Sequence, residues 1–162
     1  MSSAFGSFAS KSVQKCRTER TRNVIVFDDK FDNHGIDYDG PSSEDIKFNW
    51  PDGGWPFNVK YRVTAAFGNC STIPIPESIT QIFVWMELNK KIFPGSGIST
   101  MLTQYAEPVT VSGNILLAAA TGDKIRLCWT ANNNEVTTVY QKPTGQVPEI
   151  YSAYLNLEAI RG

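Results

Sequence analysis

The sequence predicts an all-β protein built from antiparallel strands, and two observations lead to this prediction. Many short segments alternate between apolar and polar residues, as strands with one buried face do. Gly, Pro and Asn residues interrupt these segments at short intervals, which is typical of turns between strands. No segment has the apolar spacing of a helix of three turns. A series of about eight to ten short strands indicates a sandwich, a jelly roll or a barrel.

The clearest pattern lies at residues 114–130, where two apolar runs flank the turn dipeptide Gly122-Asp123. In the second run, Ile125, Leu127 and Trp129 alternate with polar or small residues. Successive residues of a strand point to opposite faces of the sheet, so these three side chains are predicted to be buried together. The first run, residues 115–120, carries little polarity on either face. We expect the two runs to form a hairpin or a corner at the centre of a core between two sheets.

Further strands are expected along the rest of the chain. The cleanest alternation lies at residues 57–63, where four apolar side chains point inward and Lys60 and Arg62 point outward. Residues 79–88 carry apolar groups on both faces, so we expect the face with Phe83 and Trp85 to lie under another element or to meet a second subunit. The other expected strands are residues 23–27, 36–38, 46–50, 109–111, 136–140 and 153–160, and residues 143–148 are expected to form a loop.

Residues 1–22 are expected to form a basic N-terminal arm, followed by a single domain at residues 23–162. The arm is rich in serine and small residues and shows neither helical nor strand periodicity. It carries a net charge of +4, whereas residues 23–53 carry −6 and the whole chain −1. Two interpretations fit this asymmetry: a solvated tail beside a solvated loop, or an arm that docks on an acidic protein surface or a neighbouring subunit. In the second, Phe5 and Phe8 are anchors that become buried on the partner.

The composition is that of one globular domain. The chain has 162 residues, of which 41% are hydrophobic and 19% are charged. It contains no run of eighteen apolar residues, and its first residues lack the apolar segment of a secretory signal peptide, so we expect a cytoplasmic origin and no membrane partner. Its three cysteines, Cys16, Cys70 and Cys128, lie far apart and are expected to be free thiols.

Residues suited to catalysis or ligand binding are scarce. His34 is the only histidine and no G-x-S-x-G motif is present, so we predict that the protein is not an enzyme and uses no cofactor. It has no phosphate-binding loop and its basic arm is offset by the acidic segment, so nucleic acid is not an expected partner. The acidic cluster is interpreted as a solvated turn or, less favoured because the spacing does not fit an EF-hand loop, as a calcium site. The candidate calcium ligands are Asp28, Asp32, Asp37 and Asp39.

Five segments, taken in order, resemble the jelly-roll domains of the C1q and tumour-necrosis-factor (TNF) type. They are FDDKFDNHGIDYD at residues 27–39, IKFNWPDGGWPFNVKYRVTA at 46–65, IFVWMELNKKI at 82–92, VSGNILLAAATGDKIRLCW at 111–129 and PEIYSAYLNLEAI at 148–160. The Gly122-Asp123 turn matches this family well, whereas the turn near Gly54 is altered and Lys90 stands where the family has a glycine. The resemblance implies an antiparallel β-sandwich jelly roll whose C-terminal strand is buried near a subunit axis.

A second resemblance is to small virion proteins of tailed bacteriophages with this fold. It rests on AFGSF at residues 4–8, on the pair Val84-Trp85 and on the Pro-x-Ile-x-Ser motif at residues 148–152. It implies a homotrimer with a structural role on the virion. The residues then expected to contact the capsid are Phe5, Phe8, Lys11, Lys15, Arg17, Arg20 and Arg22, and those expected at the trimer interface are Phe83, Trp85, Tyr151 and Tyr154.

These resemblances lead us to expect a decoration or cement protein on the surface of the virion head, assembled in the host cytoplasm. Its partners would be its own copies and the major capsid protein or another virion protein. One alternative is a tail, neck or fibre knob that binds a receptor. The other is a soluble carbohydrate-binding jelly roll with no virion role.

Overall fold

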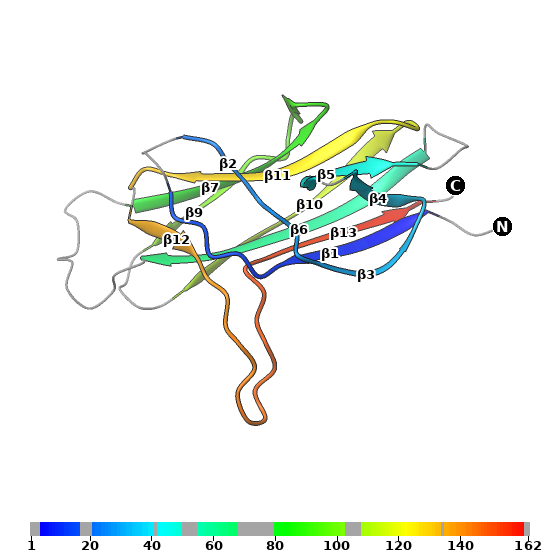
Figure 1. Ribbon diagram of the computed structural model, residues 1–162. Helices are drawn as coiled ribbons and strands as arrows, with labels where there is room; N and C mark the ends of the chain where they lie inside the picture. Colours follow the sequence, from blue (N-terminus) through cyan, green and yellow to red (C-terminus); the bar gives the residue numbers. More distant parts are fainter. Residues whose placement is uncertain are drawn as a thin grey trace.

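The protein is a sandwich of two antiparallel β-sheets, and the described part of the chain contains no helix (Figure 1). The computed structural model describes residues 4–16, 21–40, 42–49, 55–67, 80–102, 108–133 and 135–160. The prediction of an all-β antiparallel sandwich is therefore confirmed.

Each sheet brings together strands that lie far apart in the sequence. Sheet A contains β1 (Phe5–Ser10), β3 (Asp29–His34), β6 (Trp55–Phe67), β10 (Val109–Ala119), β12 (Val136–Thr138) and β13 (Ala153–Ala159). Sheet B contains β2 (Asn23–Val24), β4 (Ile36–Asp39), β5 (Ser42–Phe48), β7 (Thr80–Leu88), β8 (Lys91–Ile92), β9 (Ile98–Leu102) and β11 (Lys124–Ala131). The order in sheet A is β10-β6-β13-β1-β3, with β12 beside the C-terminal end of β6. The order in sheet B is β4-β5-β11-β7-β8, with β2 beside β11 and β9 beside β7.

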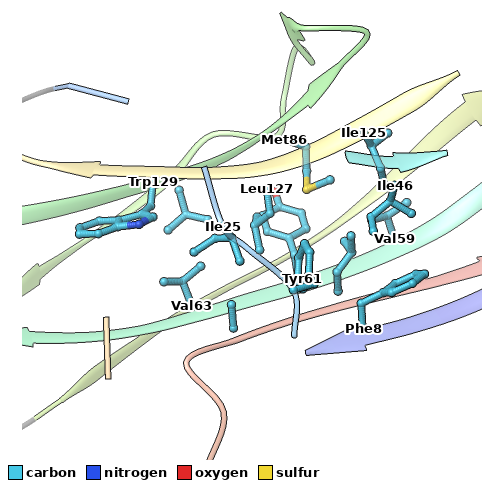
Figure 2. Packing of buried hydrophobic residues seen from close by; sticks show 14 of the residues in the cluster. Phe8, Ile25, Ile46, Val59, Tyr61, Val63, Met86, Ile125, Leu127 and Trp129 are labelled. Carbon is cyan, nitrogen blue, oxygen red and sulfur yellow. The ribbon is translucent and has the colours of Figure 1, made fainter. Parts of the chain in front are cut away.

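β6 and β11 supply much of the core, one from each sheet. Their inward residues are buried, as the alternation predicts, and burial of each such side chain contributes about 1.5 to 3 kcal/mol. Figure 2 shows these side chains filling the space between the two sheets, with Trp129 toward one end and Phe8 toward the other. The inward residues are Phe57, Val59, Tyr61 and Val63 in β6, and Ile125, Leu127 and Trp129 in β11.

The chain crosses from sheet A to sheet B between β10 and β11. Of the two predicted arrangements, hairpin or corner, the structure has the corner, because β10 pairs with β6 while β11 pairs with β7. Gly122 makes the turn with a φ of 94°, a left-handed conformation that glycine adopts without steric cost. The Asp123 carboxylate closes the turn by accepting a hydrogen bond from the Ala120 N–H at 2.9 Å.

The predicted separate arm is wrong for Phe5–Ser10, because these residues form β1 inside sheet A. β1 pairs along its whole length with β13, and it also pairs with β3. Phe8 is fully buried in the core, where its ring centroid lies 6.2 Å from that of Phe27 and 5.5 Å from that of Tyr38. Further along, the Cys16 N–H donates a hydrogen bond to the Val136 carbonyl at 2.9 Å. The first half of the predicted arm is thus part of the sandwich.

Small residues conceal this strand in the sequence. Gly6 and Ser10 lie on the same inward face of β1 as Phe8, and both are buried. The inward face therefore has one large apolar side chain instead of a repeating series, and the strand lacks the alternation by which half-buried strands are recognised.

The strand expected at residues 23–27 is shorter than predicted. Ladder pairing is confined to Asn23–Val24, which lies beside β11. Ile25 and Phe27 are nevertheless buried, and the Ile25 N–H donates a hydrogen bond to the Leu127 carbonyl at 2.9 Å. The apolar residues of this segment thus enter the core without forming a longer strand.

The two phenylalanines of β1 test whether this segment belongs to the core. We expect Phe8→Ala to lower the free energy of unfolding by about 3 to 5 kcal/mol, because a fully buried ring is lost and a cavity remains. Phe5→Ala is the matched control, since Phe5 is 39% exposed, and it should cost about 1 kcal/mol or less. Urea unfolding followed by tryptophan fluorescence measures both. If both substitutions lowered the free energy of unfolding by the same small amount, residues 5–10 would not belong to the cooperatively folded core.

Candidate functional site

The outer face of sheet A carries a concave patch of mainly polar side chains on three neighbouring strands. Alternate residues of β10, β6 and β13 point outward, and the strand register aligns them in rows across the sheet. The patch lines a depression of about 530 Å³. Its two rows are Ser112–Arg62–Tyr154 and Asn114–Lys60–Asn156, and we call these six residues the Arg62 patch.

The Arg62 patch is positively charged. The Arg62 guanidinium lies 4.2 Å from the centroid of the Tyr154 ring, which is the geometry of a cation–π contact. Within the described part of the chain, no carboxylate forms an ion pair with Arg62 or Lys60, whereas six other cationic side chains of this protein do have acidic partners. A guanidinium in such a contact can still donate hydrogen bonds from its N–H groups to an anionic or carbonyl group of a ligand or partner.

The neighbouring part of the same face differs in charge and polarity. The next row of the register is Leu116–Asn58–Glu158, and Phe5 of β1 lies beside Glu158. Leu116 is 67% exposed and Phe5 is partly exposed. The outer face of sheet A thus carries two cations near the middle of β6 and, in the row beyond Lys60, apolar side chains with a carboxylate; Lys60 and Glu158 line one depression of about 690 Å³.

A projecting hairpin, residues 140–150, borders this face. Gln141 pairs with Ile150 and Thr144 pairs with Val147, so the two legs run antiparallel. Figure 1 shows the segment between β12 and β13 extending away from the sandwich on the side of sheet A, opposite to β7 and β11. All residues at 141–148 are exposed.

An aromatic ladder joins the base of the projecting hairpin to the Arg62 patch. The ring centroids of Tyr140 and Tyr151 lie 6.3 Å apart, and those of Tyr151 and Tyr154 lie 5.2 Å apart in an edge-to-face arrangement. Tyr154 in turn stacks with Arg62. Such ring pairs have a defined geometry, so they fix the angle at which the hairpin leaves the sheet.

Polar contacts add a second constraint at the hairpin base. The Tyr140 hydroxyl donates a hydrogen bond to Glu149, and the Tyr151 hydroxyl lies 2.7 Å from a carboxylate oxygen of Glu149 and also of Asp29. The Lys11 Nζ lies 3.3 Å from Asp29 and 4.0 Å from Glu149. The hydrogen bond from Tyr140 lowers the pKa of Glu149. The single O–H of Tyr151 donates to Glu149 or to Asp29 and lowers the pKa of the carboxylate that accepts it, and the charge of Lys11 also lowers both pKa values. Both carboxylates are therefore charged at neutral pH.

No protein family model matches the chain, and no curated protein matches its sequence. Solved structures do match it. The globular domain of zebrafish complement 1qA protein has a TM-score of 0.52 at 13% identity and covers 99% of this chain and 98% of its own. Murine APRIL at pH 5.0 has a TM-score of 0.55 at 7% identity and covers 98% and 100%, and the pH 8.0 structure of murine APRIL gives the same values. The chain has a C1q/TNF-like jelly-roll fold.

The jelly roll separates the residues predicted at the trimer interface. Phe83 and Trp85 lie on the outer face of sheet B, where they are half-buried and the Trp85 Nε1–H donates a hydrogen bond to Glu87 at 3.1 Å. Tyr154 lies on the outer face of sheet A, and Tyr151 is buried at the base of the projecting hairpin. The four residues are therefore on two opposite sides of the sandwich.

The predicted capsid contacts are also distributed differently in the jelly roll. Phe8 is wrong as an anchor for a partner because it is buried in the protein's own core. Three of the basic residues pair with acidic residues of the same chain: Lys11 with Asp29, Lys15 with Glu135 at 3.7 Å and Arg22 with Glu87 at 3.0 Å. Phe5 is partly exposed, and Arg17 and Arg20 lie outside the described residues. Much of the positive charge of the predicted arm is therefore offset within the chain.

The candidate calcium ligands are not gathered into one site. Asp28 accepts a hydrogen bond from the Lys11 N–H at 2.7 Å, Asp37 pairs with Lys30 at 3.0 Å and Asp39 pairs with Lys124 at 2.7 Å. Asp32 is exposed on β3. Among the described residues, no three His, Cys, Asp or Glu side chains lie close enough to hold a metal ion. The same residues contain no helix that is long and apolar enough to cross a membrane.

Sequence analysis identified only parts of the Arg62 patch. It predicted that Lys60 and Arg62 point outward and that Tyr154 and Asn156 alternate with buried residues. It did not predict that β10 and β13 flank β6, because cross-strand register depends on contacts between distant segments.

The hairpin base gives a prediction about pH. The folded-state pKa values of Glu149 and Asp29 lie below their unfolded values, so their stabilising effect is present at neutral pH and is lost as the pH falls below about 4. We expect Tyr151→Phe to reduce amide-exchange protection at Gln141 and Ile150 at pH 7, and the difference from the unmodified protein to shrink by pH 3. Tyr154→Phe is the control, because no contact of its hydroxyl with described residues is lost. An effect of Tyr151→Phe that is equal at both pH values would contradict the assigned role of the carboxylates.

Proposed function

We propose that the protein is a non-enzymatic structural protein of a tailed-bacteriophage virion, which assembles as a homotrimer and decorates or cements the head. The observation that carries the proposal is the outer face of sheet A, which carries the cationic Lys60 and Arg62 and, in the row beyond them, Glu158 and the exposed Leu116. The resemblance of the sequence to C1q/TNF-type domains and to small phage virion proteins supports the number of subunits and the location.

The charges on sheet A favour a head-to-tail contact between copies. Lys60 and Arg62 lie near the middle of β6, and Glu158 lies one row beyond Lys60, in the same row as the exposed Leu116. In the proposed trimer, the Leu116–Asn58–Glu158 row of one copy packs on the Arg62 patch of the next. A contact between two different patches is heterologous, and its repetition gives a closed ring when the rotation between copies closes.

The edge of sheet A supports the same proposal. β10 is the edge strand, and residues 108–121 contain no charged side chain. Long edge strands without charges are prone to aggregate unless another chain or element covers them. A neighbouring copy on this side would bury Leu116 and protect the edge.

The contact with the shell is proposed for the opposite side of the sandwich. Phe83, Trp85 and Ile92 line an apolar depression of about 370 Å³ on sheet B, and Ile92 is 66% exposed. A trimer that uses sheet A leaves this side free for a capsid partner. Binding across the joints between shell subunits would stabilise the shell, because that binding free energy is lost when the joints open.

A charge-swap experiment tests the trimer. The unmodified protein should sediment as three chains, and Arg62→Glu or Glu158→Arg alone should raise the apparent dissociation constant by about tenfold or more. The double variant should recover much of the affinity, because the two charges are exchanged between the partners. Lys91→Glu, an exposed charge on β8, is the control and should leave the mass unchanged. Monomers at all concentrations of the unmodified protein would contradict the proposed function.

Particle imaging and shell binding test the virion role. Antibody against the chain should label many sites on phage heads, whereas a few labels at the neck or tail would favour a fibre knob. Ile92→Asp should lower binding to empty heads by about tenfold or more and leave the trimer intact, because it places a charge in an apolar contact. Val13→Asp is the matched control, since Val13 is an exposed apolar residue outside this depression. Absence of label from all particles would contradict the location.

A further inference from the structure

The projecting hairpin has a rigid base and an exposed tip. Among the contacts of the described residues, residues 141–150 make backbone pairs only with each other. Val147 is 48% exposed, although a β-branched apolar residue gains little from contact with water. A two-stranded hairpin without a hydrophobic face to pack on is marginally stable in water, so an ordered hairpin of this kind gains stability from a partner.

The composition of the tip indicates how a partner is contacted. Pro143 and Pro148 lack a backbone N–H and interrupt the edges of both legs, so strand addition along the hairpin is unfavourable. Contact through side chains is favoured instead, with Val147 as the apolar group and Lys142 as the only charged residue at 141–148. A surface with some apolar area and net negative charge suits this tip.

The direction of the hairpin indicates where the partner lies. The hairpin extends on the side of sheet A (Figure 1). Its base is linked to the Arg62 patch by the ring contacts of Tyr151 with Tyr154 and of Tyr154 with Arg62. A partner protein bound to the outer face of sheet A would therefore lie beside the hairpin. Under the proposed function, that partner is a second copy of the chain.

A second copy also has the surface chemistry that the tip requires. β3 exposes Phe31 and Asp32, and Asp32 forms no ion pair within the described part of the chain. β3 is an edge strand of sheet A, so it is accessible to a neighbour that packs on that face. Lys142 and Val147 can thus meet acidic and apolar groups of the adjacent copy.

We propose that the projecting hairpin is a clasp that packs against a neighbouring copy of this chain seated on the outer face of sheet A. This inference rests on the proposed homotrimer and adds the element that holds it together. The aromatic ladder and the Glu149 contacts set the angle of the clasp, and the tip makes the contact between subunits.

Truncation of the hairpin tests the clasp. Residues 142–148 are replaced by Asn-Gly, which retains Tyr140, Glu149 and Tyr151 and can close a two-residue turn. The apparent dissociation constant of the trimer, measured by sedimentation velocity over a range of concentrations, should rise by about tenfold or more. The thermal unfolding of dilute monomer should stay the same, because the removed residues lie outside the core. Val147→Asp should weaken the trimer in the same direction, and Val13→Asp should not.

A cross-linking experiment identifies which protein the hairpin tip contacts. A photo-reactive phenylalanine analogue is placed at position 147 in chains labelled with nitrogen-15, which are mixed with unlabelled chains before irradiation. Cross-linked peptide pairs of mixed isotope that include residues 29–34 would support the clasp. If the unmodified protein forms a trimer and the truncated protein forms it with the same dissociation constant, the clasp is overturned and the proposed trimer is not. Cross-links that join only residues of the same chain would have the same meaning. An unmodified protein that never forms a trimer would overturn the proposed function itself.

Discussion

The pleat of β6 is the constraint on which the rest of the structure depends. This strand of thirteen residues pairs with β10 on one side and with β13 and β12 on the other, so it is an inner strand of sheet A. Because side chains alternate, burial of Phe57, Val59, Tyr61 and Val63 forces Asn58, Lys60 and Arg62 onto the opposite face. The same requirement that builds the core therefore also creates the cationic patch, and neither can be changed by a shift of one residue without disrupting the other.

Charge pairing within the chain decides which surfaces are available to partners. The basic residues near the N-terminus are drawn to carboxylates of the sandwich, as in the pairs Lys11–Asp29 and Arg22–Glu87. Glu87 is almost fully buried, and burial of an unpaired carboxylate would lower the stability of the fold. The ion pair with Arg22 offsets this cost. Lys60 and Arg62 lack such partners among the described residues. Lys60 and Arg62 are thus available to an external acidic group on sheet A, away from the segment that holds the largest excess of basic residues in the sequence.

The aromatic residues near the C-terminal strand link the core, the patch and the hairpin. Tyr154 faces outward from β13 and stacks with Arg62, while its neighbour Tyr151 turns toward Asp29 and Glu149 at the base of the hairpin. Burial, together with the neighbouring carboxylates, raises the pKa of Tyr151, so its hydroxyl remains a hydrogen-bond donor. Because these aromatic side chains are rigid, their contacts hold the projecting hairpin at a defined orientation relative to sheet A. In this C1q/TNF-like jelly roll, a projecting hairpin is thus oriented by contacts with the sandwich itself.

The sequence by itself determined the class of fold and the inward faces of the long strands. Alternation at 57–63 and 124–130 predicts the buried residues of β6 and β11, because a strand's two faces are encoded by nearest neighbours in the chain. Tertiary structure decided the place of β1, whose small residues carry no alternation and which is a strand because β13 and β3 supply its hydrogen bonds. It also decided the Arg62 patch and the separation of Phe83 and Trp85 from Tyr154, since these depend on which distant strands lie side by side. The alternation of side chains along a strand can be identified in the sequence. The register between strands and their order in each sheet depend on pairing and apolar burial between segments that are distant in the sequence.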